Sequence, residues 1–341
     1  MKSLIYSLLA FLFLGTTNVV AQEVDGAGPI NVPSPGIIDG VFIKSNVITK
    51  KMVPYEHVRE ADAIWSKRVF EYIDLREKVN HPLYYPLDDI SPSGVWERNE
   101  SRLSLFTVIR DHVMNGDLTV FSPYDPLTGG TGDWDGYQLK YPIEPEPGLS
   151  WDTDPEFRDR MFYYLGNLTG ATDEAMTDQW GDDSTIVNPD GSEEIVYWPQ
   201  DTAWYTSRDI IQYRMKEDWF FDKQRSVLDV RIIAIAPVVY KTEEDGNGEA
   251  SISGMKELFW LYFPHCRFVF NNYFVYNEKN DAQWMSFDDL FWKRRFNSVI
   301  YKQSNSYDRK IESYRAGVDA LYESEAIKNE IRNIEHDVWS F

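Results

Sequence analysis

The chain has 341 residues, of which 43% are hydrophobic and 15% aromatic, so it can bury the core of one large domain or two ordinary ones. Its formal net charge of −21 disfavours a protein that holds nucleic-acid phosphates, because such proteins present clustered Lys and Arg. A local basic patch could still face lipid headgroups or an acidic protein. The only cysteine is Cys266, which excludes an internal disulfide.

The first 21 residues have the composition of a secretory signal peptide. Lys2 supplies a positive charge, residues 4–14 are apolar, and Val19 to Ala21 form a cleavage site with small side chains. The apolar stretch is too short for a confident membrane span. No cysteine follows this stretch directly, so we expect an exported protein without a lipid anchor of its own.

Residues 22–53 predict an extended N-terminal arm, because they are rich in Gly, Pro, Val and Ile and have no helical period. The arm carries apolar side chains with no obvious core to join, among them Ile38, Val41 and Phe42. Extended segments can add to the sheet edge of another chain through backbone hydrogen bonds. We therefore expect the arm to contact a neighbouring copy or a partner protein.

A core is predicted to begin at residue 54 with a helix. Residues 55–79 place apolar side chains at helical spacing, and residues 81–86 then predict an extended segment. A second helix fits residues 101–115, with Gly116 as its stop, and residues 118–121 predict a short strand. The apolar positions of the first helix are Ala61, Ile64, Trp65, Val69, Tyr72 and Ile73.

Residues 122–204 predict a long, loop-rich insertion, because Gly, Asp, Pro, Trp and Thr dominate and periodicity fades. Residues 188–191 are a turn signal inside it and predict a hairpin. Five aspartates in turn-like sequence could bind Ca²⁺, but no stretch has the full Asp-x-Asp-x-Asp-Gly loop, so turn formation is the favoured explanation. They are Asp133, Asp135, Asp182, Asp183 and Asp190.

The later part of the core predicts mostly strands. A short helix over 208–218 leads to an alternating strand at 227–239, and a polar turn at 243–249 precedes a partner strand at 256–264. Further strands are expected within 267–276. A run of strands with flanking helices predicts an α+β fold with an antiparallel sheet.

Ser286 and Asp289 have the spacing of a capping box and predict a helix over 287–296. A cationic cluster lies on this helix: Lys293, Arg294 and Arg295. We expect Arg294 and Arg295 to pair with acids of another chain, with an intramolecular salt bridge as the equal alternative. The helix shares a residue pattern with 62–70, which suggests an internal repeat, although short amphipathic helices often coincide by accident.

From Tyr307 onwards, apolar residues recur at helical spacing in two runs, 311–321 and 327–338. The gap between the runs breaks a strict heptad, so two docked helices fit better than one long coiled coil. The C-terminal helical segment, 307–341, either packs on its own domain or binds a partner. It would thus follow an α+β core that spans residues 54–306.

Four acids lie in the stretch that runs from Lys216 to Tyr240: Glu217, Asp218, Asp222 and Asp229. Near Trp219 and Phe220, Glu217 or Asp218 could pair with Asp222 as the acid and base of a glycosidase, with aromatic platforms for sugars in 134–204. However, they alternate with four cations, which is more typical of a salt-linked surface than of a tuned site. The cations are Lys216, Lys223, Arg225 and Arg231.

Motifs of the common catalytic and cofactor sites are absent from the sequence. It has no GxSxG, HExxH, Walker A or GxGxxG motif, and no two histidines lie three or four residues apart. His265 next to Cys266 lacks further soft ligands at a zinc-site spacing. We therefore expect no catalytic residue, no metal and no cofactor.

Four long blocks carry a family resemblance. They are ADAIWSKRVFEYIDLREKVNHPLYYP (61–86), YRMKEDWFFDKQRSVLDVRIIAIAPV (213–238), LFWLYFPHCRFVFNN (258–272) and NDAQWMSFDDLFWKRRFNSVIYKQSNSYDRKI (280–311). In these blocks the chain resembles the GldN/PorN family, the soluble periplasmic component of the type IX secretion and gliding machinery of Bacteroidetes. The insertion 122–204 and the residues after 312 carry little of the likeness.

The resemblance implies no reaction. It implies a ring built with the GldK/PorK lipoprotein beneath the outer membrane and engaged by the GldL and GldM motor, with membrane association through the lipoprotein alone. Such a ring needs a heterologous interface between copies, for which aromatic and Arg side chains are suited. Our candidate interface residues are Trp219, Phe220, Asp222, Arg225, Lys293, Arg294, Arg295, Ile38, Val41 and Phe42. A periplasmic carbohydrate-active or carbohydrate-binding protein is the alternative.

Overall fold

The computed structural model describes residues 51–91, 96–97, 99, 102–124, 139–169, 185–187, 193–195, 201–244, 250–280, 283 and 285–339. The predicted signal peptide, residues 1–21, lies outside this part. So does nearly all of the predicted arm, with Ile38, Val41 and Phe42, and so do the five aspartates considered for Ca²⁺. No helix within the described part is long and apolar enough to cross a membrane.

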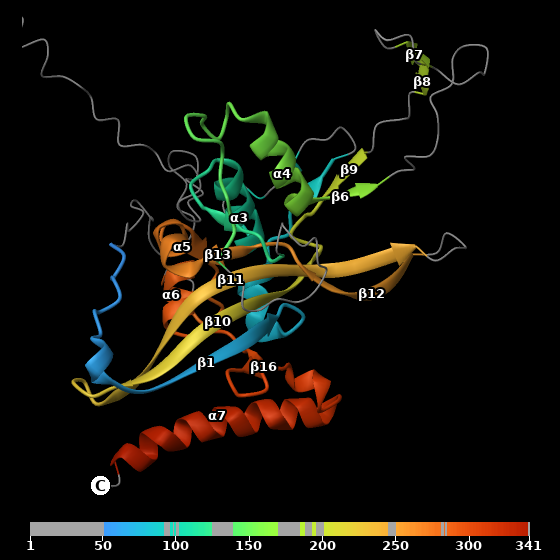
Figure 1. Ribbon diagram of the computed structural model, residues 1–341. Coiled ribbons are helices and arrows are strands. Elements are labelled where there is room, and N and C mark those ends of the chain that lie inside the picture. The colour runs from blue at the N-terminus through green and yellow to red at the C-terminus, as the bar shows by residue number, and fades with distance from the viewer. Residues whose placement is uncertain are drawn as a thin grey trace, which may run out of the picture.

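An antiparallel sheet of eight strands organises the molecule and confirms the α+β class (Figure 1). Its three long strands are β1 (Ala63–Asp74), β10 (Ile210–Asp222) and β11 (Val227–Glu244). The strand order is β16-β1-β10-β11-β13-β4-β5, and β12 pairs separately with β11. The shorter strands of this sheet are β4 (Val120–Phe121), β5 (Pro142–Ile143), β12 (Ala250–Glu257), β13 (Trp260–Tyr262) and β16 (Val299–Gln303).

Strand β1 corrects the prediction of a helix over 55–79. It pairs with β10 from Ala63 to Asp74, and Val69 and Ile73 are fully buried. Trp65, Val69 and Ile73 are four residues apart, a spacing that fits both one face of a helix and one face of a strand, so only the pairing partner decides. The predicted helix over 208–218 is wrong for the same reason, because β10 lies between two long neighbours.

The helices surround the long strands, with α3, α4 and α5 above them and α7 beneath them in the view of Figure 1. Ser104 caps α3 as a helix N-cap, and Gly116 ends the following turn with a φ of 81° where a Cβ would meet Trp151. The helices are α2 (His81–Tyr84), α3 (Leu105–Met114), α4 (Pro155–Leu165), α5 (Phe263–Phe270), α6 (Phe287–Trp292) and α7 (Val318–Trp339).

Several predicted element types need correction. Residues 81–86, expected to be extended, begin with α2, and most of 267–276 belongs to α5 or its following turn rather than to strands. The C-terminal segment holds one long helix, α7, in place of two docked helices. The internal repeat is also wrong, because its first copy is a strand and its second lies in and after α6. The capping box of Ser286 and Asp289 is confirmed.

Short elements complete the described part of the fold. The predicted hairpin of the insertion is confirmed by β7 (Thr185–Val187) and β8 (Glu193–Ile195), which pair with each other. The remaining short strands are β2 (Asp89–Ile90), β3 (Trp96–Glu97), β6 (Gly166–Thr169), β9 (Asp201–Trp204), β14 (Phe274–Val275) and β15 (Met285–Ser286). The 3₁₀ helices are η1 (Glu60–Asp62), η2 (Lys78–Asn80) and η3 (Ile311–Ser313).

Three apolar clusters hold the described elements together; the smallest joins Ala234, Ala236 and Trp260, and the other two flank the site. The larger joins Ile73, Met215 and Ile232 of the sheet to α3, α4, α5 and α6. The smaller joins Val69 and Ile300 of the sheet to α7, through Ile327 and Ile331. Val69 and Ile73 are an even number of residues apart on β1, so they lie on one face of the sheet, and both clusters meet on that face.

Candidate interaction site

A buried group of charges lies between the two apolar clusters, and we call it the inner cluster: Glu71, Glu217 and Arg294. Glu217 on β10 faces Val69, two residues before Glu71 on β1, so both carboxylates point to the same face. Arg294, just after α6, donates to both Glu217 oxygens at 2.8 and 3.0 Å and to Glu71 at 3.2 Å. Glu217 and Glu71 share one guanidinium and are 0% and 1% exposed, respectively.

Neutral donors complete the inner cluster. Ser298 donates to Glu71 at 2.5 Å, and the indole N–H of Trp219 donates to Glu217 at 3.2 Å. Burial, and then the nearby Glu71 carboxylate, raise the pKa of Glu217 to about 7, although Arg294 and Trp219 oppose the rise. Two buried carboxylates tied to one guanidinium join β1 and β10 to the end of α6, so this arrangement suits holding elements together.

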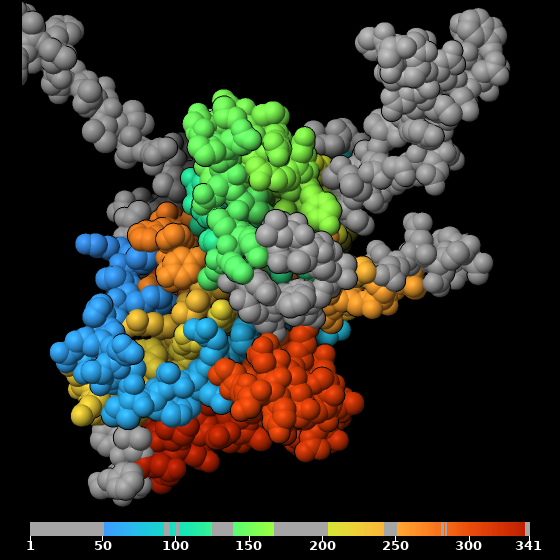
Figure 2. All heavy atoms as spheres, in the orientation of Figure 1, coloured from blue at the N-terminus to red at the C-terminus, as the bar shows by residue number. Residues whose placement is uncertain are grey.

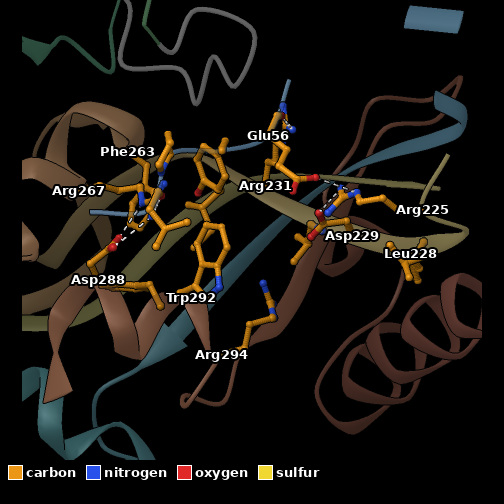
Figure 3. Close-up of a pocket in the computed structure, with 17 residues that line it drawn as sticks. Glu56, Arg225, Leu228, Asp229, Arg231, Phe263, Arg267, Asp288, Trp292 and Arg294 are labelled. Carbon is orange, nitrogen blue, oxygen red and sulfur yellow. Dashed lines mark hydrogen bonds and ion pairs between the residues drawn. The ribbon is translucent and has the colours of Figure 1, made fainter. Parts of the chain in front are cut away.

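A cavity of about 320 Å³ lies on the side of Arg294 away from Glu71, along the edge of β11, and we call it the β11 groove. Residues 227–232 of β11 form one wall, residues 53–56 cross it, and α5 and α6 form the other wall. In Figure 3, Arg267 and Asp288 lie toward one end, Arg225 and Asp229 toward the other, and Arg231 and Trp292 lie between them. The groove therefore joins three parts of the chain that are distant in sequence.

The edge of β11 in the groove has no strand beside it. Among the described strands, β13 reaches β11 only at Ala234 and Ile235, and β12 pairs with it only from Val238 onwards. The backbone N–H of Val230 is instead bound by the Asp229 side chain at 2.8 Å. An open strand edge carries unpaired backbone groups and is a ready template for another chain.

Residues 53–56 are held in place by two arginines. Arg267 donates to the Val53 carbonyl at 2.7 Å, and Arg231 donates to the Glu56 carbonyl. The Tyr55 ring stacks on Trp292 with centroids 5.5 Å apart and lies under the Arg267 guanidinium at 4.4 Å. Burial raises the pKa of Tyr55 to about 12, so this ring is a neutral anchor. Residues 53–56 thus form a strap across the groove.

Arg225 organises a second group of charges at one end of the groove, which we call the rim cluster: Arg225, Asp222, Asp229 and Glu56. The guanidinium contacts the three carboxylates at 2.8, 2.8 and 3.2 Å, respectively. The hydrogen bond from Arg225, with backbone N–H groups of the β10–β11 turn, lowers the pKa of Asp222.

Deeper in the groove, Arg267 and Asp288 form a buried ion pair with two hydrogen bonds of 2.7 and 3.1 Å.

The four acids between Lys216 and Tyr240 each pair with an arginine of their own chain. Glu217 belongs to the inner cluster, and Asp222 and Asp229 belong to the rim cluster. Asp218 accepts two bonds from Arg68 at 2.6 and 2.7 Å. The structure therefore shows the salt-linked pattern for all four acids.

The candidate interface residues separate into inner and outer positions. Arg294 takes the intramolecular alternative, and Trp219 and Phe220 lie under Arg294 and Arg231 with ring distances of 5.1 Å. Arg295 contacts Asn277 and Met285 in its own chain. Lys293 is exposed, 3.6 Å from Asp289. An interface role for these residues stays a prediction, and it is best supported for Arg225 and Lys293, whose side chains keep solvent access.

Sequence reasoning missed Tyr55, Glu71, Arg267 and Asp288. Glu71 lies in a segment that was predicted to be a helix, and Arg267 lies in one that was predicted to be a strand. With the wrong element type, the direction of neither side chain could be predicted. The one local signal was the pair of aspartates that follows Ser286, of which Asp289 caps α6 and Asp288 turns to Arg267. Charged residues that pair across long sequence distances leave no periodic trace.

A second cavity of about 360 Å³ lies between α7 and the sheet, against Glu71 of the inner cluster. Lys328 and Arg332 of α7 line it, and Lys328 donates to the Ser298 carbonyl. The inner cluster is thus bounded by the β11 groove on one side of Arg294 and by α7 on the other.

Comparison with known proteins identifies the family. The family model described as gliding motility associated protein GldN matches residues 58–340. No curated protein matches the chain. The matched range starts just after residues 53–56 and includes the whole inner cluster and every member of the rim cluster except Glu56. The chain therefore belongs to the GldN family and is a component of the gliding motility and type IX secretion machinery.

Proposed function

We propose that the chain is a non-catalytic structural subunit of this machinery. It is exported to the periplasm and forms a ring with a GldK/PorK-type lipoprotein at the inner face of the outer membrane, where GldL- and GldM-type motor proteins engage the ring. The family match carries this proposal. It is supported by the pairing of the four candidate catalytic acids with arginines of the same chain.

The structural role is tested by purification of a tagged chain from cell envelopes. We expect the lipoprotein to co-purify, with ring-shaped particles visible by electron microscopy. A chain that remains a free monomer, with no lipoprotein bound, would contradict the proposal. Such a chain, if its melting temperature rose in glycans, would support the carbohydrate-binding alternative instead.

The absence of catalysis is tested by Asp218→Asn combined with Asp222→Asn. These changes remove two of the candidate carboxylates and keep the size of each side chain. We expect secretion to follow the amount of assembled ring in this variant, since the acids act through their arginines. A stop in secretion with intact fold and intact ring would show that a carboxylate does chemistry.

A further inference from the structure

The C-terminal helix α7 lies along the lower margin of the molecule in the view of Figures 1 and 2. Two of its side chains, Ile327 and Ile331, are buried in the smaller apolar cluster. At its start, Val318, Leu321 and Tyr322 are 64%, 47% and 69% exposed, respectively. A helix with so few buried apolar side chains is typical of segments that open locally while the core stays folded.

A cavity separates part of α7 from the sheet. It has a volume of about 360 Å³, and Lys328 of α7 lines it together with Glu71 and Ser298. Two hydrogen bonds connect α7 to the segment around β16. The Ser324 hydroxyl accepts one from the Ile300 N–H at 2.9 Å, and Lys328 donates one to the Ser298 carbonyl. Opening of the helix would break these bonds and let water reach the Glu71 carboxylate.

α7 contributes to the burial of the inner cluster. Glu217 faces Val69 on the neighbouring strand, and Trp219 lies two residues further along the same face of β10. Val69 and Trp219 both belong to the smaller apolar cluster, which includes Ile327 and Ile331 of α7. The helix thus covers the part of the sheet from which Glu217 points, and it keeps water away from both carboxylates.

The inner cluster contains more acid than base. Two carboxylates accept hydrogen bonds from the single guanidinium of Arg294, so one negative charge has no cation within the cluster. Two buried carboxylates that share one site favour a proton on one of them, because like charges at short distance repel each other. Hydration after opening removes this demand. The closed state of α7 therefore holds a proton that the open state releases.

Other charged groups also face the inner cluster. α7 brings Lys328, Arg332 and Glu335 to the cavity, and the strap brings Tyr55, whose ring is neutral because its pKa is raised to about 12. Lys328 favours the charged carboxylates, so α7 has two opposing effects: it excludes water and it adds a cation. The exclusion of water is the larger effect, because the pKa of Glu217 is raised to about 7 with Lys328 in place, and burial is the first cause.

We propose that α7 is a proton-sensitive lid over the inner cluster: it stays closed while one carboxylate carries a proton, and it opens more often after that proton is lost. A group with a raised pKa in the closed state stabilises closure fully below its pKa in the open state, and this contribution is lost as pH rises through the higher value. For Glu217 these limits are its ordinary pKa of 4.5 and about 7. Because the lid belongs to a single copy, it goes beyond the proposed function and does not depend on ring assembly.

Hydrogen–deuterium exchange of the full-length chain at pH 5, 6, 7 and 8 tests the lid, with each rate corrected for intrinsic exchange at that pH. Amides of α7 should exchange faster than those of β10 and β11 at every pH, as expected for an opening that leaves the sheet folded. The opening constant of α7 should increase by about tenfold or more from pH 5 to pH 8, since each unit of pKa difference corresponds to a factor of ten. An opening constant that stays constant or falls with pH, or that equals that of the strands, would overturn the proposal.

Three substitutions identify the groups that are responsible. Glu217→Gln leaves a single acid for Arg294, so the opening constant of α7 should become nearly independent of pH. Glu71→Gln should act in the same way, and it replaces the first variant if that one does not fold by circular dichroism. Glu335→Gln is the matched control, because Glu335 lines the cavity from α7 but lies outside the inner cluster. This control should keep the wild-type pH dependence; its loss there, or its persistence in the two inner-cluster variants, would refute the lid.

Lys328→Met separates the two effects of α7. The change removes the cation and its hydrogen bond to Ser298, but it leaves the helix as a cover. The increase in opening with pH should persist in this variant, because exclusion of water causes it. An opening constant that no longer depends on pH would assign the effect to Lys328 and overturn the proposal.

Discussion

The inner cluster and the rim cluster contain the same chemistry with opposite consequences. In each, one arginine serves more than one carboxylate: Arg294 holds two and Arg225 holds three. Yet the pKa of Glu217 is raised to about 7, whereas the pKa of Asp222 is lowered. An ion pair with arginine therefore does not by itself decide the sign of the shift.

Depth and the neighbouring carboxylate decide it, since each acid accepts three hydrogen bonds. Glu217 lies deep between two apolar clusters, where the charged form loses its hydration and faces a second carboxylate. Asp222 also has little exposed surface, but it lies at the β10–β11 turn, where Arg225 and two backbone N–H groups donate to it. Hydrogen bonds at the turn therefore favour the charged form of Asp222, whereas deep burial beside another acid outweighs a similar set of hydrogen bonds at Glu217.

Removal of Arg294 should have the largest effect on this contrast. Arg294→Met leaves two buried carboxylates without their cation, so we expect the free energy of unfolding at pH 8 to fall by about 3–5 kcal/mol. The loss should shrink toward pH 5, because protonation of Glu217 removes a buried charge. Urea unfolding followed by tryptophan fluorescence measures both effects.

Arg295→Met is the matched control for Arg294→Met. The two arginines are neighbours in sequence, but Arg295 contacts only the neutral groups of Asn277 and Met285 among its side-chain hydrogen bonds. Its loss should cost less than about 1 kcal/mol, as for most surface substitutions. Equal losses for the two variants would contradict the special role of the inner cluster.

Glu217→Gln should remove a pH dependence of stability. The folded pKa of Glu217 is raised from 4.5 to about 7, so this group makes the wild type less stable as pH rises through that window. At about 1.4 kcal/mol per pKa unit, the decrease is at most about 3 kcal/mol. The variant should lack the decrease and exceed the wild type at pH 8. Unfolding curves at pH 5, 6, 7 and 8 test this, and parallel pH profiles would exclude it.

Asp222→Asn should show a smaller effect with the opposite sign. The folded pKa of Asp222 is lowered from 3.8, so this group stabilises the protein above that pH, and the contribution is lost as pH falls through the folded pKa. The wild type should therefore be more stable than the variant near neutrality, and the difference should vanish in strong acid. Acid unfolding of both proteins by circular dichroism measures it; a difference that grows in acid would be inconsistent with the rim cluster.

The ion pair of Arg68 and Asp218 should contribute least to the free energy of unfolding. Its side chains are 45% and 31% exposed, so water and salt screen the attraction despite two short bonds. A double-mutant cycle with Arg68→Met and Asp218→Asn should give a coupling energy below about 1 kcal/mol, which falls further in high salt. A coupling as large as that of Arg294 would show that depth is not the deciding factor.

Local sequence signals predicted much of the framework. Gly116 marks the end of α3, which was predicted to begin at residue 101 and begins at Leu105, and the Ser286 capping box starts α6, because caps and stops depend on a few adjacent residues. The alternation in 227–239 identified the start of β11, and the residue blocks of the resemblance pointed to the family that the match confirms. α4 was missed, although Asp154 before Pro155 is a helix-start signal.

Tertiary structure decided the rest. Whether residues 63–74 form a helix or a strand depended on β10, because the four-residue spacing of Trp65, Val69 and Ile73 fits both periods. β10 is far away in sequence: Arg68 and its partner Asp218 are 150 residues apart. Likewise, the sequence determined that Glu217 is an acid among cations, but only the fold buried it beside Glu71 and aimed Arg294 at both. Charge and cap signals are properties of neighbours in sequence, whereas burial and long-range ion pairs are properties of neighbours in space.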